Sequence, residues 1–290
     1  MSVGKGQANN TISRENASEF LKNIDIPSCP SIVTDVLNLA KSDMPDLRKL
    51  ANIVAGDVAI SAAAIKMANS PMFRSGSPIS SVHQAINLLG IRNTITVVAS
   101  VALRNTGKGL PAQFLDEFWS RASTTALGAA LIARYTRAAN PETAYTYGLF
   151  HDAAIPIMML RFSDYPAAII EKAKQNNISL TEQENISYNC THPVVGSIIV
   201  RTWGLPLEIS LAIRAHHDED PFDERREELT STVKGLIAVT QLAEFLLNEL
   251  RHENSLEITP EQYDQAVAYL EIDGTDLAEI HDLLEPLIKL

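Results

Sequence analysis

The sequence contains very little cysteine. Only Cys29 and Cys190 are present in 290 residues, so a disulfide framework and a structural zinc site built from cysteines are both excluded. Two isolated thiols are typical of a protein that works in a reducing compartment. We therefore expect the protein to be cytoplasmic.

Long hydrophobic runs and an excess of positive charge are also missing. The longest mostly apolar run, Ile95 to Leu103, is too short to cross a bilayer, and the first ten residues contain no apolar block of the kind found in secretory signals. The formal net charge is −11 and the pI is about 5.1, so a nucleic-acid backbone would be repelled. We expect no membrane insertion and no DNA or RNA binding.

The residues that are present predict an all-α fold. Hydrophobic residues make up 46% of the chain, which is ordinary for a globular protein, and they recur with a helical period in almost every segment. Glycines 107 and 109, followed by Pro111, form the clearest break. We predict two closely packed helical bundles, with a polar extension over 1–20, an N-terminal subdomain over 21–109 and a C-terminal subdomain over 110–290.

Several helix ends can be predicted from local signals. Ser31 is expected to cap a helix, and Gly90 is expected to end one helix just before another begins. Asn140 followed by Pro141 supplies a cap and a first-turn proline for the helix that carries His151. Pro156 is expected to lie inside that helix and to kink it.

The pair His151 and Asp152 lies in the otherwise almost wholly apolar stretch GLFHDAAIP. An imidazole and a carboxylate are costly to bury unless each has a partner. His192, His216 and His217 are the candidate partners, and imidazole and carboxylate together are good ligands for first-row divalent metals. The alternative is a structural pair without metal, in which the carboxylate orients the imidazole by a hydrogen bond.

Many short motifs follow one another along the chain in a recognisable order. They are Ile26-Pro27 with Pro30, Gly56-Asp57-Val58-Ala59, Ala68-Asn69-Ser70 with Phe73, Ile79 and Ser80, Ala85-Ile86 with Leu88-Leu89-Gly90, Gly148 to Asp152, His192 with Gly196, Trp203 with Leu205-Pro206, and His216-His217. Over roughly Leu21 to Asp218 the chain resembles the HDOD domains of bacterial signalling proteins, which are relatives of the HD phosphohydrolases. The resemblance implies that the C-terminal bundle is HD-like.

The resemblance also implies a metal-ligand set, which this sequence fills only in part. HD hydrolases bind metal through an early His, the His-Asp dyad, later histidines and a late Asp, and they act on phosphoesters. The dyad matches His151 and Asp152, and the later histidines match His192, His216 and His217. The early His is expected at Ala122 and the late Asp at Thr240, so both are absent, and the Gly and Lys that usually follow the dyad are replaced by Ala154 and Ile155.

The incomplete set favours a non-catalytic signal-transduction module that binds a protein partner or a small ligand and needs no cofactor. In that interpretation His151 and Asp152 brace the interior. The alternative is a metal-dependent phosphohydrolase that uses Mn, Fe or Zn to cleave a nucleotide or cyclic nucleotide phosphoester. A third possibility is a pocket that senses a small molecule through the remaining histidines.

Overall fold

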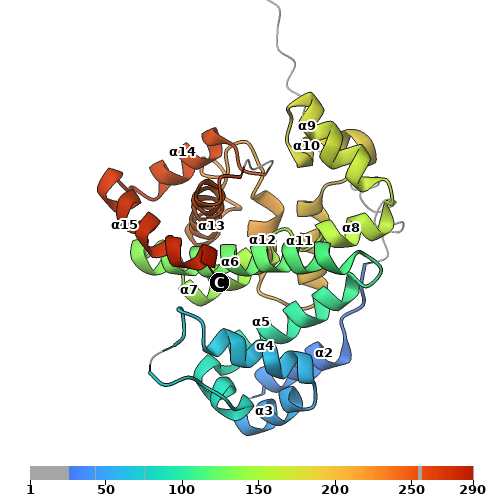
Figure 1. Ribbon diagram of the computed structural model, residues 1–290, viewed down its shortest axis with the longest axis vertical. Coiled ribbons are helices and arrows are strands. Elements are labelled where there is room, and N and C mark those ends of the chain that lie inside the picture. The colour runs from blue at the N-terminus through green and yellow to red at the C-terminus, as the bar shows by residue number, and fades with distance from the viewer. Residues whose placement is uncertain (1–25, 43, 75, 254–256, 290) are drawn as a thin grey trace, which may run out of the picture.

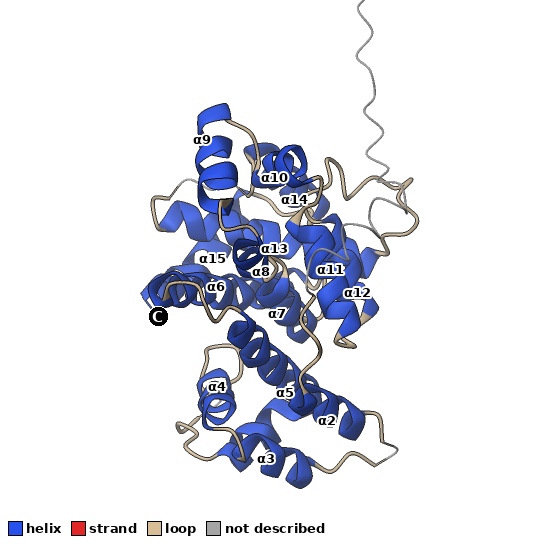
Figure 2. Cartoon of the chain, turned by 90° about the vertical axis from the view of Figure 1, so that its right-hand side faces the viewer, coloured by secondary structure: helices blue, strands red, loops and turns tan. Residues whose placement is uncertain are grey.

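The computed structural model describes residues 26–289 except 43, 75 and 254–256, and every regular element in that part of the chain is a helix. Figures 1 and 2 show these helices in two groups, and the only β-bridge among the described residues is an isolated one between Lys108 and Leu110. The predicted all-α fold is confirmed. The predicted polar extension over 1–20 lies outside the described residues.

The N-terminal group is built around one long helix. Three shorter helices pack against α5, and their apolar faces form a shared core. Its elements are α2 (Ser31–Ala40), α3 (Leu47–Ala55), α4 (Val58–Ala68) and α5 (Val82–Thr106). One prediction needs correction here: the residue at the N-cap of α2 is Pro30 rather than Ser31. The predicted helix end at Gly90 is confirmed, because α5 consists of two helices joined across a kink at that residue.

The backbone of α5 leaves the helical region at Gly90, where φ is 70°. Glycine adopts such a conformation without the steric cost that a Cβ would add. By length and composition α5 could cross a membrane, as could the sequence Pro141–Asn176 if two helices bent by 117° counted as one. In this fold α5 is a core helix: Asn93, Thr94 and Thr96 are buried on it along with its apolar residues.

The C-terminal group is larger and is arranged around α6, α7 and α13. Helix α6 packs against α7 and α13, while α7 also contacts α5, α12 and α13 (Figure 1). Its elements are α6 (Ala112–Thr136), α7 (Pro141–Phe150), α8 (Ile155–Arg161), the π-helix η1 (Pro166–Glu171), α9 (Lys172–Asn176), α10 (Leu180–Tyr188), α11 (His192–Thr202), α12 (Leu207–Ala215), α13 (Ser231–Leu250), α14 (Pro260–Tyr269), α15 (Gly274–Leu284) and the 3₁₀ helix η2 (Glu285–Lys289).

Helix α7 begins where the sequence predicts and ends earlier than expected. The Asn140 side chain accepts a hydrogen bond from the Thr143 N–H at 3.0 Å, as an N-cap does. The helix stops at Phe150, and residues 151–154 form a turn. Pro156 therefore lies in the first turn of α8, where its missing N–H costs nothing, and the predicted kink inside a continuous helix was wrong.

Two glycines bring helices of this group unusually close together. A Cβ at Gly148 would lie 3.0 Å from the Cα of Ala126, so α7 approaches the backbone of α6. A Cβ at Gly196 would lie 3.1 Å from a methyl group of Ile213, so at this position the backbone of α11 packs directly against a side chain of α12. These contacts place the ends of α7, α11 and α12 around one point.

Gly235 sets the position of α13. A Cβ added there would lie 2.2 Å from the carbonyl oxygen of Ala138, which belongs to the backbone between α6 and α7 and cannot move aside easily. Gly235→Ala is therefore expected to lower the free energy of unfolding by about 2 kcal/mol or more in urea denaturation. The matched control is Gly274→Ala at the start of α15, where the added Cβ meets open space. Equal stability of both variants would contradict this account of the packing.

Candidate functional site

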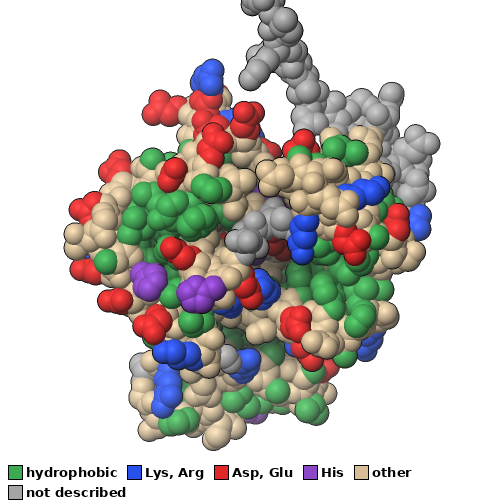
Figure 3. Space-filling model, turned by 45° about the horizontal axis from the view of Figure 1, so that its top comes forward, with side chains coloured by type: hydrophobic (Ala, Val, Ile, Leu, Met, Phe, Trp, Pro, Cys, Tyr) green, Lys and Arg blue, Asp and Glu red, His purple; other side chains and the backbone are tan. Residues whose placement is uncertain are grey.

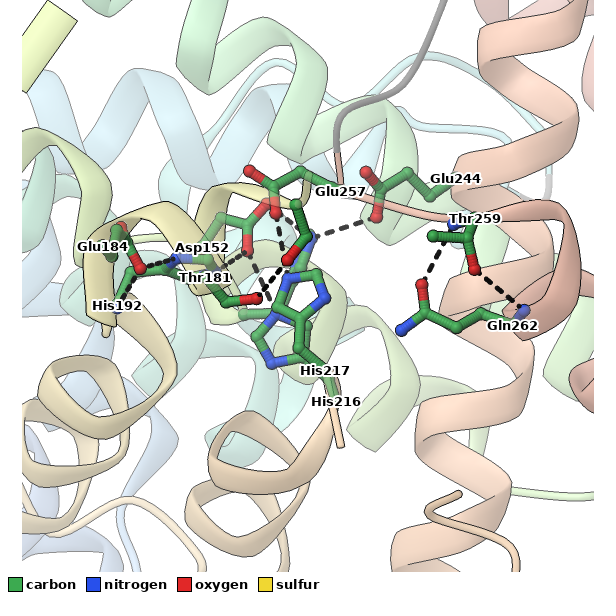
Figure 4. Close-up of polar contacts among 12 residues, drawn as sticks. Asp152, Thr181, Glu184, His192, His216, His217, Glu244, Glu257, Thr259 and Gln262 are labelled. Carbon is green, nitrogen blue, oxygen red and sulfur yellow. Dashed lines mark hydrogen bonds and ion pairs between the residues drawn. The ribbon is translucent and has the colours of Figure 1, made fainter. Parts of the chain in front are cut away.

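The five site residues predicted from the sequence meet where three helices end or begin. His151 follows the last residue of α7 and Asp152 comes next, His192 is the first residue of α11, and His216 and His217 follow α12. One ligand atom from each of Asp152, His192, His216 and His217 can be chosen so that all four lie within 4.8 Å of one another. Figure 4 shows these side chains converging from different segments of the chain.

Asp152 lies at the centre of this His/Asp/Glu cluster. Its Oδ1 is 3.3 Å from the Nε2 of His192 and 3.3 Å from the Nε2 of His216. Its Oδ2 is 3.0 Å from the Nε2 of His151. The two carboxylate oxygens therefore face different imidazoles.

Three further carboxylates complete the cluster, and the sequence analysis missed all of them. Glu184 on α10 contacts the Nδ1 of His192 at 2.9 Å, Glu244 on α13 lies 3.5 Å from the Nε2 of His151, and Glu257 lies 3.0 Å from the Nε2 of His217. Glu244 could have been found, because it interrupts an apolar stretch of α13 between Leu242-Ala243 and Phe245-Leu246-Leu247. Glu184 and Glu257 lie in polar surroundings and carry no such signal.

The two positions at which ligands were expected to be missing behave differently. Ala122 is buried on α6 and offers no ligand atom. Thr240 is buried on α13, where the neighbouring Gln241 donates a hydrogen bond to the backbone carbonyl of His216 at 2.8 Å. The carboxylate contributed by α13 comes from Glu244, one helical turn further along.

Hydrogen bonds at the Nδ1 atoms fix the orientation of three imidazole rings. His151 Nδ1 is 2.8 Å from the carbonyl of Gly148, and His216 Nδ1 is 2.7 Å from the carbonyl of Ile213. In both cases the partner is three residues back, at the end of a helix that has carbonyls to satisfy. The Nδ1 of His192 meets Glu184 instead. With a proton on Nδ1, the Nε2 lone pair of each ring is free to bind a metal.

Glu184 is itself held firmly. It is fully buried, its Oε2 accepts a hydrogen bond from the backbone N–H of His192 at 2.9 Å, and its Oε1 accepts one from the Tyr165 hydroxyl. A carboxylate behind the far nitrogen of a histidine is the usual outer partner of a metal-ligating imidazole, because it fixes the ring and increases its basicity.

The Nε2 atoms of His151, His192 and His217 are buried and form no hydrogen bond. Each nevertheless has a carboxylate oxygen 3.0 to 3.3 Å away. Donor atoms that share one ion at bond lengths of about 2.1 Å lie roughly this far apart without bonding to each other. The residues therefore fit a divalent metal with mixed imidazole and carboxylate ligands, such as Mn, Fe or Zn.

Burial and charge separate the pKa values within the metal-free cluster. Burial lowers the pKa of His216 and of His217 to about 3, and in each case repulsion from a neighbouring histidine adds to the effect. Burial also opposes protonation of His151, but the Asp152 carboxylate outweighs it and holds the pKa of His151 well above its usual range. Burial raises the pKa of Glu257 to about 8.

These shifts predict distinct protonation states for the histidines. In metal-free protein at pH 5, His216 and His217 are expected to remain neutral because pH 5 is well above their lowered pKa values of about 3, whereas His151 is expected to be protonated. Long-range ¹H–¹⁵N NMR correlations of the imidazoles measure this directly. Titration of His216 near the ordinary histidine pKa of about 6.5 would show that the cluster is open to water.

The chain was compared with protein-family models, with curated proteins and with solved structures. Residues 26–219, about two thirds of the chain, match the HDOD domain. The chain belongs to the HDOD domain family. The comparison with curated proteins found no match.

Solved structures of HDOD domain and related proteins share the fold. An HDOD domain protein of unknown function from Geobacter sulfurreducens is 24% identical, with a TM-score of 0.65 over 94% of this chain and 97% of that chain. A candidate metal-dependent phosphohydrolase from Shewanella amazonensis is 20% identical, with a TM-score of 0.65 over 94% and 98%. A candidate signal transduction protein from Marinobacter aquaeolei is 17% identical, with a TM-score of 0.66 over 97% of this chain and 65% of that one.

Proposed function

We propose that this HDOD protein is a metal-binding signalling module. In this proposal the His/Asp/Glu cluster holds a divalent first-row ion, and a partner protein recognises the metal-bound form. The observation that carries the proposal is the convergence of ligand atoms from Asp152, His192, His216 and His217, which all lie within 4.8 Å of one another in a nearly closed site.

The residues that would hold the ion are Asp152, His192, His216 and His217, with Glu184 behind His192 as the outer partner. A divalent ion supplies positive charge to a buried group of carboxylates and, where one coordination position stays open, acts as a Lewis acid. Asp152, Glu184 and Glu244 have no Lys or Arg ion-pair partner among the described residues. A bound cation would replace the protons that now balance these charges.

The enclosure of the cluster favours a signalling role over catalysis. The side chains of Asp152, Glu244 and Glu257 are 13 to 15% exposed, and those of the four histidines are 0 to 6% exposed. A phosphoester needs room beside the ion and commonly needs Arg or Lys to hold its oxygens. The match to a candidate signal transduction protein supports this choice.

One observation favours a metal-dependent phosphohydrolase as the second candidate. A second group of possible ligands, His151, Asp152 and Glu244, shares Asp152 with the first group, and each oxygen of Asp152 faces a different group. Two ions bridged by one carboxylate are a frequent arrangement in hydrolases of phosphate esters. The name of the Shewanella neighbour is consistent with this alternative.

Replacing the outer carboxylate tests the metal site. Glu184→Gln is expected to reduce Mn²⁺ or Zn²⁺ affinity about 10- to 100-fold, because loss of such a partner weakens the ligand it supports. Isothermal titration of the chelator-treated protein measures the affinity. The matched control is Glu182→Gln, an exposed acid on the same helix. No metal binding by the folded wild-type protein would refute the proposal, and equal affinity in both variants would exclude Glu184 as the outer partner.

A turnover assay separates the two candidate functions. If the protein is a signalling module, the Mn²⁺-loaded form should hydrolyse bis(p-nitrophenyl) phosphate and 3′,5′-cyclic nucleotides no faster than the loaded His151→Ala variant does. The reason is that the enclosed cluster leaves the phosphoester no access. Turnover by the wild-type protein that His151→Ala abolishes, with metal content and folding unchanged, would establish the phosphohydrolase instead.

A further inference from the structure

A cavity of about 410 Å³ lies between the two helical groups, away from the His/Asp/Glu cluster. Residues of α4 and α5 line one side of it, and residues of α6 and α7 line the other; Figure 1 shows these four helices side by side. No histidine lines the cavity, so it is not the histidine pocket considered from the sequence. Its volume falls in the range of small-molecule sites, which are typically about 300–1,000 Å³.

Most polar side chains around the cavity already have partners. The hydroxyls of Ser100, Ser123 and Thr124 each donate to a carbonyl of their own helix at 2.7 to 2.9 Å. Asn69 is also fully used, since its side chain bonds to the backbone of Ile65 and Ile79 at 2.8 to 3.0 Å. These groups hold the walls in place, so they are not free to bind a ligand.

Among the described residues, two buried side-chain donors that line the cavity form no hydrogen bond. The indole N–H of Trp119 and the hydroxyl of Ser70 are both buried and form no hydrogen bond. The Trp119 side chain has almost no access to solvent, since the residue is only 5% exposed. A buried indole nitrogen usually finds an acceptor, because an indole N–H can only donate and leaving it unpaired is costly. The missing partner is therefore a hydrogen-bond acceptor.

The charges at the cavity have a single sign. Lys66 and Arg104 line it, and no carboxylate does. Arg104 pairs with Asp116, but both side chains are more than half exposed and such pairs are weak. Lys66 has no ion pair among the described residues. This contrasts with the net charge of −11 and with the acidic side chains spread over the face in Figure 3.

We propose that this cavity binds a small amphipathic carboxylate. The apolar body of the ligand packs against Met67, Val97, Leu127 and Leu149, while its carboxylate accepts hydrogen bonds from Trp119 and Ser70 and is attracted by Lys66. The carboxylate matches both the unpaired donors and the positive charge, and a neutral acceptor would match only the donors. This inference does not depend on metal binding at the cluster.

Decanoate below its micellar concentration is a suitable probe. We expect saturable one-to-one binding by isothermal titration, together with a change in tryptophan emission, because Trp119 is one of only two tryptophans. The Ala63→Leu variant, which adds three side-chain carbons at the cavity wall, is expected to weaken binding about tenfold or more. Its matched control is Ala62→Leu, at an exposed position on the same helix outside the cavity, which should bind as the wild type does.

Two further variants test the polar contacts separately. Trp119→Phe and Lys66→Gln are each expected to weaken decanoate binding about three- to tenfold, and Trp119→Phe should also remove the fluorescence change. Lys66 is exposed, so its replacement leaves the fold intact. Decanol, which has the same chain without the charge, should bind more weakly than decanoate. Absence of saturable binding, equal affinity in Ala63→Leu and Ala62→Leu, or equal affinity for decanol would overturn the proposal.

Discussion

The arrangement of the C-terminal helices depends on one largely buried carboxylate. Asp152 contacts three imidazole nitrogens, and this contact constrains where the helices can lie. A buried charge that loses its partners costs several kcal/mol, so the partners must arrive together with the carboxylate. The partners of Asp152 are His151, His192 and His216, which lie at helix ends that meet around the carboxylate. The close approaches at Gly148 and Gly196 make that meeting possible.

Burial and neighbouring charges give the members of the cluster very different affinities for protons. The pKa of His151 is held high while those of His216 and His217 are lowered by burial, so protons are distributed unevenly over similar groups only a few ångströms apart. A change in the charge of one side chain of the cluster alters the preferred protonation of the others. If a cation binds there as proposed, its charge would change which of these groups hold protons.

The sequence predicted those parts of the protein that local chemistry determines. The helical period gave the all-α class, and caps such as Asn140 gave helix starts. The His-Asp pair stood out because it interrupts an apolar stretch. Glu184 could not be found this way, because its neighbours in the sequence are polar and its burial follows only from the packing of α10 against η1, α9 and α11. Pro156 was misplaced because a proline signal cannot distinguish a kinked helix from the start of a new one.

The segment that matches the HDOD family ends at residue 219, whereas Gln241, Glu244 and Glu257 lie beyond it. Helix α13, which carries the first two, is buried along much of its length against α6, α7 and α12. The segment that matches the family is therefore shorter than the C-terminal group of helices that packs together. A fragment cut at the family boundary would expose the apolar faces that α13 covers and would leave His151 without one of its carboxylates. Substitutions in α13 can change the cluster while every motif residue stays the same.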